Sequence, residues 1–117
     1  MKNIPLAPDT NKHSCPVTYC LSVIGGKWKP VILFCIARGV DRFGAMQRAV
    51  PGITKQMLTK QLRELESDGL ITRTVFAEVP PRVDYALSEV GKSVLPVVEK
   101  MAEWGKENMK ERPFAAP

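Results

Sequence analysis

The chain has 117 residues, 44% of them hydrophobic, and its 17 basic and 12 acidic residues give a net charge of +5. This length allows one domain with a hydrophobic core, and the sequence has no stretch of about 18 apolar residues that could form a transmembrane helix. Residues 1–11 lack the apolar stretch of a signal peptide, and the three cysteines are typical of reduced thiols. We therefore expect a cytoplasmic protein with no membrane partner.

The first half of the chain predicts three helices. Residues 1–14 are polar and interrupted by two prolines, which predicts a mobile arm. A proline in the first turn and a pair of glycines at the end predict a short helix over 16–24. A second helix begins at Pro30, and its seven consecutive apolar residues, 31–37, predict burial on all sides. A third, short helix is expected over 44–50.

The next helix has the pattern of a DNA-reading helix. Thr54 is a good N-cap, Gly69 is a good stop, and Leu58, Leu62 and Leu65 recur at helical spacing as an apolar stripe. The opposite face and the first turn carry five polar residues: Lys55, Gln56, Thr59, Lys60 and Arg63. A helix that enters the major groove presents its N-terminal turns to the bases in this way. The same pattern also fits an ordinary solvated face.

Two strands and a long helix follow. Residues 70–77 are rich in Thr, Val, Ile and Phe, and residues 83–87 alternate with period two, which predicts a hairpin joined by a stiff loop over 78–82. A serine then caps a last helix that we expect over 89–112, with an internal proline that should kink it or mark a junction between two helices.

This order of elements predicts a mainly α fold with a small β-hairpin, that is, a winged helix-turn-helix with additional N- and C-terminal helices. We expect one domain over 15–112, with the arm over 1–14 and a tail over 113–117. The last helix has more apolar positions than a small core can cover. Pairing with the first helix in the seam of a homodimer would bury the surplus; the alternative is that the last helix folds back on its own wing.

Short motifs between Cys15 and Gly105 resemble, in order and spacing, the HxlR-type transcriptional regulators, which are relatives of the bacterial MarR-like regulators. These motifs include Cys15-Pro16-Val17, Ile24-Gly25-Gly26-Lys27-Trp28, Pro51-Gly52-Ile53, Leu62-Arg63-Glu64-Leu65-Glu66, Asp68-Gly69-Leu70, Val79-Pro80-Pro81-Arg82-Val83 and Glu103-Trp104-Gly105. The resemblance implies a homodimer, built from the terminal helices, that binds double-stranded operator DNA and regulates nearby genes.

The position of each polar residue suggests its part in DNA binding. We expect Gln56, Thr59, Lys60 and Arg63 to project into the major groove, with Lys55 near the DNA backbone. Gln can pair bidentately with adenine, and Arg or Lys with guanine. Thr54 should hold the helix N-terminus, whose free N–H groups suit a phosphate.

Further basic residues are candidates for contacts outside the major groove. Residues 25–82 hold ten Lys/Arg and five Asp/Glu, which places the basic surplus on the predicted DNA-binding segment. Arg82 is the candidate for the minor groove or a phosphate at the wing, and Arg73 is a weaker one. Phosphate contacts are also possible for three further residues that fit solvated surface charges equally well: Lys27, Arg42 and Arg48. Trp28 and Phe43 are expected in the core rather than stacked on bases.

No pattern predicts catalysis, a cofactor or a metal site. The single histidine, His13, lies in the predicted arm, and Cys20 and Cys35 fit small core side chains. Cys15 lies at a helix N-terminus, where the dipole favours a thiolate. In the resembled family this position often holds a redox- or electrophile-sensing cysteine, but a packed or N-capping cysteine is the alternative.

Three hypotheses follow from the sequence. The first is a dimeric DNA-binding regulator, with no residue pattern that indicates its small-molecule effector. The second is the same regulator with Cys15 as a thiol sensor. The third is a winged-helix module that binds a protein partner instead of DNA, which the basic surplus of residues 25–82 disfavours.

Overall fold

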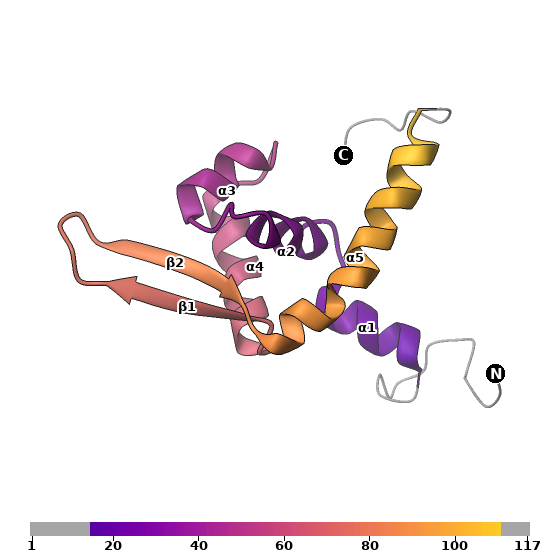
Figure 1. Ribbon diagram of the computed structural model, residues 1–117, viewed down its shortest axis with the longest axis horizontal. Helices are drawn as coiled ribbons and strands as arrows, with labels where there is room; N and C mark the ends of the chain where they lie inside the picture. Colours follow the sequence, from indigo (N-terminus) through magenta and orange to yellow (C-terminus); the bar gives the residue numbers. More distant parts are fainter. Residues whose placement is uncertain (1–14, 111–117) are drawn as a thin grey trace.

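The computed structural model describes residues 15–110, and it has the element order of a winged helix-turn-helix (Figure 1). The predicted arm and tail lie outside the described residues, so the domain limits stay predictions. No single helix in the described part is long and apolar enough to cross a membrane; two short helices pass that test only as a pair bent by 69°. The elements are α1 (Pro16–Ile24), α2 (Lys29–Ala37), α3 (Phe43–Ala49), α4 (Lys55–Ser67), β1 (Ile71–Phe76), β2 (Arg82–Leu87) and α5 (Glu89–Asn108).

Helix α4 begins and ends at the residues that the sequence predicts. The Thr54 hydroxyl accepts a hydrogen bond from the Met57 N–H at 3.1 Å, which satisfies one of the free N–H groups at the helix start. After the helix, Gly69 adopts a left-handed conformation with φ of +80°, which glycine reaches without steric cost. The three leucines of the apolar stripe are buried, so the polar face of α4 is turned outward.

The core lies between α2, α3, α4 and the base of the hairpin. Helix α2 contributes three buried side chains, but Val31 is exposed, so the prediction that this helix is buried on all sides is wrong. A nine-residue helix in a small domain has too few neighbours to cover its whole circumference. The buried core residues are Ile24, Ile32, Leu33, Ile36, Met46, Val50, Ile53, Leu58, Leu62, Leu65, Leu70, Ile71 and Val98.

Strands β1 and β2 form the antiparallel wing, with a register that runs from Ile71 opposite Leu87 to Phe76 opposite Arg82. Arg82 therefore begins the second strand, whereas the sequence analysis placed it in the loop. Leu70 and Ile71 anchor the base of the hairpin in the core, and the far end projects away from the helices (Figure 1).

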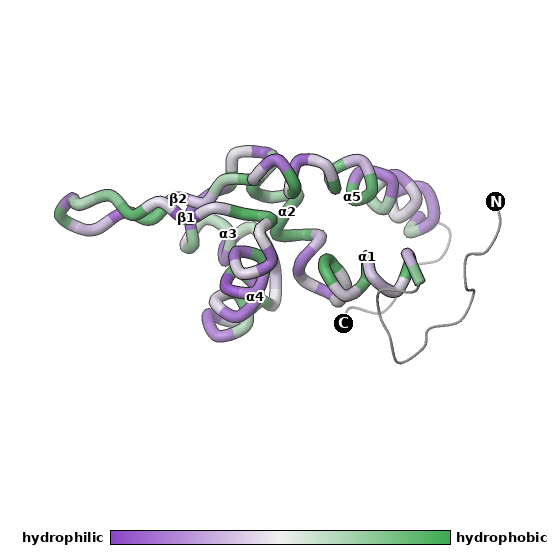
Figure 2. The backbone as a smooth tube through the Cα atoms, turned by 90° about the horizontal axis from the view of Figure 1, so that it is seen from below, coloured by the Kyte–Doolittle hydropathy of each residue, from purple (hydrophilic) through white to green (hydrophobic). Residues whose placement is uncertain are grey.

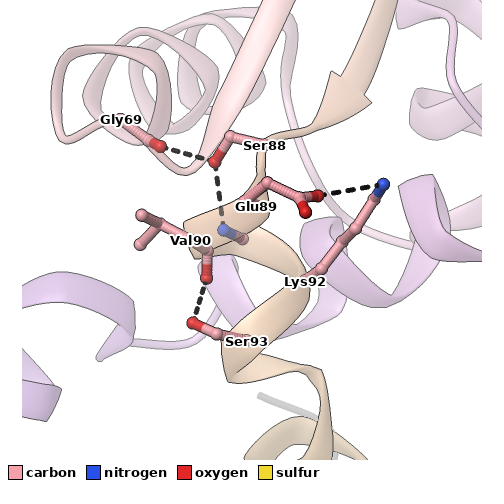
Figure 3. A network of polar contacts seen from close by, with 7 residues as sticks. Gly69, Ser88, Glu89, Val90, Lys92 and Ser93 are labelled. Atoms are coloured by element: carbon pink, nitrogen blue, oxygen red, sulfur yellow. Dashed lines mark hydrogen bonds and ion pairs between the residues drawn. The ribbon is translucent and has the colours of Figure 1, made fainter.

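Helix α5 begins at a small polar network (Figure 3). The Ser88 hydroxyl accepts a hydrogen bond from the Gly91 N–H at 3.0 Å and donates one to the Gly69 carbonyl at 2.6 Å, which ties the start of α5 to the end of α4. The helix continues through Pro96 as one element, and its ribbon changes direction along its length (Figure 1). It ends at Asn108, earlier than the predicted residue 112.

Helices α1 and α5 lie at the end of the molecule opposite the wing tip, while α4 shows a largely hydrophilic backbone trace (Figures 1 and 2). In α1 only Ile24 is buried, and the apolar residues Val17 and Leu21 are exposed. The first helix therefore has an apolar surface that residues 15–110 leave uncovered.

Candidate nucleic-acid interface

The turn between α3 and α4 presents the start of α4 to solvent. Gly52 turns the chain with a φ of +87°, and the Ile53 side chain returns to the core directly before Thr54 caps α4. Because Ile53 is buried and the leucine stripe of α4 faces the same core, the orientation of α4 about its own axis is set by packing. The N-terminal turns of the helix are left accessible.

The solvent side of the first turns of α4 carries Lys55, Gln56, Thr59, Lys60 and Arg63, which we call the α4 polar face; Thr59 is half-buried and the other four are exposed. These residues line an open hollow of about 540 Å³ together with Glu64. Among residues 15–110, no ion pair or side-chain hydrogen bond engages any member of the α4 polar face. Three positive charges and one amide are thus available to a ligand.

The carboxylate that borders the α4 polar face is neutralised from inside the protein. Lys29 Nζ lies 2.7 Å from Glu64 Oε1. The hydrogen bond from Lys29 and its positive charge hold the pKa of Glu64 below its ordinary value, so the carboxylate stays ionised and paired. No local pattern in the sequence predicts a part for Lys29 in the site, because the pair joins two helices far apart in sequence.

A second hollow, of about 340 Å³, separates α4 from the wing. Arg63 of the α4 polar face and Arg73 of β1 both line it, together with Glu66. Arg73 is exposed and has no ion pair within the described part of the chain. The structure therefore brings one predicted base reader and one predicted wing contact to the same opening.

The other wing arginine is more constrained than the sequence suggests. The Arg82 guanidinium lies over the ring of Phe76, with Cζ 4.0 Å from the centroid, and it pairs with both Glu78 and Asp84. Arg42 pairs with the same Asp84 from the start of α3. Arg82 and Asp84 are two positions apart on one strand and so share a face, but no local signal in the sequence reveals Arg42 as the second partner of Asp84.

The remaining basic candidates lie on the surface. Lys27 and Arg48 are exposed, and the Lys27 ammonium lies 4.5 Å from the centroid of the Trp28 ring. Trp28 and Phe43 pack against the core, as predicted. Their rings are therefore partly buried in packing and are not presented as a platform for bases.

The three cysteines differ in their surroundings. Cys15 occupies the N-cap position of α1 without a side-chain cap hydrogen bond, and it is only 3% exposed. Cys20 and Cys35 are half-buried against the core, which confirms the prediction of small core side chains. Burial raises the pKa of the Cys35 thiol, which makes this cysteine a poor nucleophile at neutral pH.

Solved structures with this architecture are named as regulators. The redox regulator HypR in its oxidized form superposes with a TM-score of 0.76 at 48% identity, over 80% of this chain and 96% of that chain. A MarR-family transcriptional regulator from Enterococcus faecalis V583 superposes with a TM-score of 0.69 at 34% identity, over 92% of this chain and 96% of that chain. The fold and these similar structures define the class: a winged helix-turn-helix transcriptional regulator.

The sequence relatives place the chain within that class. It is 49% identical over 98 residues to the HTH-type transcriptional regulator YybR of Bacillus subtilis, covering 84% of this chain and 78% of that protein. An HTH-type transcriptional regulator of Methanothermobacter thermautotrophicus is 50% identical over 96 residues, covering 82% of this chain and 73% of that protein. Residues 23–113 match the HxlR-like helix-turn-helix family, and the chain belongs to this family.

Proposed function

We propose that this chain binds operator DNA in the cytoplasm as a homodimer and regulates transcription, with residues 15–112 as the DNA-binding domain. The observation that carries the proposal is the α4 polar face, whose three positive charges and one amide form no hydrogen bond or ion pair in the described part of the chain. A buried apolar stripe on the other side of α4 prevents this face from turning inward. Exposed, unpaired donors at the start of a second helix are what major-groove recognition requires.

Each contact follows from the place of its residue in the fold. Gln56, Lys60 and Arg63 face the base edges, with Thr59 beside them and Lys55 near the phosphates. Thr54 holds the N-terminus of α4, where free N–H groups and the helix dipole suit a phosphate. Basic residues around this helix extend the positive surface along the DNA backbone: Lys27, Arg42, Arg48, Arg73 and Arg82.

Dimerisation is supported by uncovered apolar surface at the end opposite the wing. On α5 an exposed stripe follows helical spacing through Val90, Val97, Met101 and Trp104, the last of which is 59% exposed. Helix α1 also has exposed apolar residues, Val17 and Leu21 among them. Residues of α1 and α5 together line a hollow of about 440 Å³. Apolar surface of this extent is usually covered by a partner, and a second copy would place two α4 helices on one duplex.

We also propose that Cys15 responds to oxidants or electrophiles. Its place at the N-terminus of α1 supports this, because the helix dipole favours the thiolate. A solved structure 48% identical to this chain is named as a redox regulator. In this chain a disulfide from Cys15 would have to reach the partner subunit or a small thiol.

A direct binding titration tests the proposal. The full chain should retain a fluorescent duplex from the region upstream of its own gene, and binding should weaken steeply as salt is raised. Light scattering on the same sample should report a dimer. Salt-independent binding, or equal affinity for this duplex and a scrambled one, would contradict operator recognition.

A further inference from the structure

A cluster of charged residues joins the wing to the turn between α2 and α3. Asp84 Oδ1 lies 3.3 Å from Arg42 Nε and 3.4 Å from Arg82 Nε, so a single carboxylate oxygen faces both guanidinium groups. Arg42 belongs to the helix-turn-helix and Arg82 to the wing. Asp84 is thus the only charge that touches both parts of the proposed DNA interface within residues 15–110.

The two ion pairs at Asp84 are longer than well-formed hydrogen bonds between charged groups. Charge-assisted N–H···O bonds usually measure about 2.7–2.9 Å. Here both distances are longer, and Asp84 Oδ1 and Arg82 Nε are buried atoms without a hydrogen bond of good geometry. The Asp84 carboxylate attracts both arginines and holds them in position, although neither arginine forms a well-aligned hydrogen bond with it.

The same place is where the wing is attached to the helices. The Tyr85 N–H donates a hydrogen bond to the Asp41 carbonyl at 2.9 Å, directly beside the Asp84–Arg42 pair. Two consecutive residues of β2 therefore contact two consecutive residues of the α2–α3 turn. Beyond this point the hairpin projects from the body of the protein (Figure 1). A change at Asp84 would be transmitted to the direction of the whole wing.

Both arginines also line an open hollow of about 400 Å³ beside Pro80 and Pro81. Because Arg42 Nε is directed at Asp84, the terminal nitrogens of Arg42 remain for another partner, whereas Arg82 Nη1 already lies 3.6 Å from Glu78 Oε2. Arg42 is the more accessible, with 55% of its side chain exposed against 31% for Arg82. Glu78 lines the same hollow, so the two arginines are balanced by two carboxylates, and the exposed terminal nitrogens of Arg42 are the donors that a phosphate would contact.

We propose that Asp84 is a positioning residue that holds Arg42 and Arg82 as one phosphate-binding pair and thereby fixes the wing relative to α4. This inference rests on the proposed DNA-binding function. Asp84 lowers the total positive charge of the interface, so it weakens the attraction to DNA of any sequence. In return, Asp84 increases the discrimination between operator and other DNA. A wing held at one angle reaches the DNA backbone only when α4 is in register with its operator.

The test compares the affinities of Asp84→Asn and wild type for a duplex selected by the wild type and for a scrambled duplex of equal length. Asp84→Asn should bind the scrambled duplex more tightly, while the ratio of operator to scrambled affinity should fall by about tenfold. Asp84→Glu, which restores the carboxylate, should recover most of the ratio. Glu78→Gln is the matched control, because it removes the same charge from the wing but contacts only Arg82. Glu78→Gln should raise the affinity for both duplexes by the same factor.

A second variant keeps the test decisive if Asp84→Asn folds poorly in a thermal unfolding scan. Arg42→Gln removes the link to the helix-turn-helix at an exposed side chain and should also lower the ratio. Adding Asp84→Asn to Arg42→Gln should then lower the ratio of operator to scrambled affinity little further, because both substitutions remove the same contact. An unchanged ratio in Asp84→Asn, or an equal fall in Glu78→Gln, would overturn the proposal. A wild type that fails to discriminate the duplexes would overturn the proposed function first.

Discussion

Lys29 and Glu64 form an ion pair with 2.7 Å between Nζ and Oε1, and the pair joins the start of α2 to the middle of α4. Only 12% of the Lys29 side chain is exposed, so its charge is matched within the protein more than by solvent. Glu64 borders the α4 polar face, where an unpaired negative charge would repel phosphate. The pair therefore positions α4 and removes a charge conflict from the proposed interface.

The pair should make stability depend on pH in a defined direction. Lys29 lowers the pKa of Glu64 in the folded state, so the stabilisation is present above the ordinary carboxyl pKa of about 4.3 and is lost as the pH falls through the folded value. Glu64→Gln should therefore unfold at a lower temperature than wild type near neutral pH, and the difference should vanish in strong acid. Circular dichroism melts across this range measure it.

Glu66→Gln is the control for that series, because Glu66 is exposed and has no ion pair among residues 15–110. It should show no pH-dependent difference from wild type. If the melting temperature of Glu64→Gln stays below that of wild type by the same amount from neutral pH to strong acid, the charge of Glu64 does not contribute to stability.

Gly91 should be essential to the packing of α5. A Cβ atom built there would collide with the Leu70 carbonyl, where the first turn of α5 meets the start of the wing. Gly91→Ala should lower the free energy of unfolding by about 1–3 kcal/mol, the usual cost of overpacking. Gly105→Ala lies on the same helix with nothing within 4 Å of its added methyl, and it should be neutral or stabilising. Urea unfolding compares the two, and equal effects would contradict this description of the α5 start.

Trp104 should be part of the dimer seam. Its ring is largely exposed in one protomer, so Trp104→Asp should leave the fold intact and shift the full chain from dimer to monomer at micromolar concentration. Light scattering measures the mass, and Glu99→Ala, a change at another exposed position of α5, should leave it unchanged. A wild type that is monomeric under these conditions, or a Trp104→Asp dimer as tight as wild type, would remove the two-half-site arrangement.

Cys15 should be the most reactive of the three thiols despite its burial. Its place at the N-terminus of α1 favours the thiolate, whereas burial raises the pKa of Cys35. Mass spectrometry after brief iodoacetamide treatment should find Cys15 alkylated several-fold faster than Cys20 or Cys35. Diamide should change operator binding by wild type and have no effect on Cys15→Ser. Equal labelling of all three, or a diamide response that survives in Cys15→Ser, would show that Cys15 is a packing residue.

Local signals explain why much of the fold could be predicted. Thr54, Gly69 and Ser88 act on their immediate neighbours through caps and left-handed turns, so the sequence indicates where α4 and α5 begin and where α4 ends. Val31 shows the limit of composition, because an apolar run does not reveal how many neighbours will cover it.

The parts of the candidate site that could not be predicted are contacts between distant segments. Lys29 meets Glu64, and Asp84 meets Arg42, across more than thirty positions of the chain. Charge spacing along one helix or strand carries no information on such pairs. Arg82 was predicted as a loop residue because the prolines before it end the pairing, but the strand resumes at Arg82 itself.

The most direct test of the central claim is a selection from randomised duplexes with wild type, Arg63→Ala and Gln56→Ala. Loss of a base contact should erase the preference at particular base positions, at a cost of about 1–3 kcal/mol for the preferred base, and should change affinity for scrambled DNA much less. Lys27→Ala should instead weaken all duplexes alike and reduce the salt slope by about one. If both α4 variants select the same sequences as wild type with the same preference, then α4 does not read the operator.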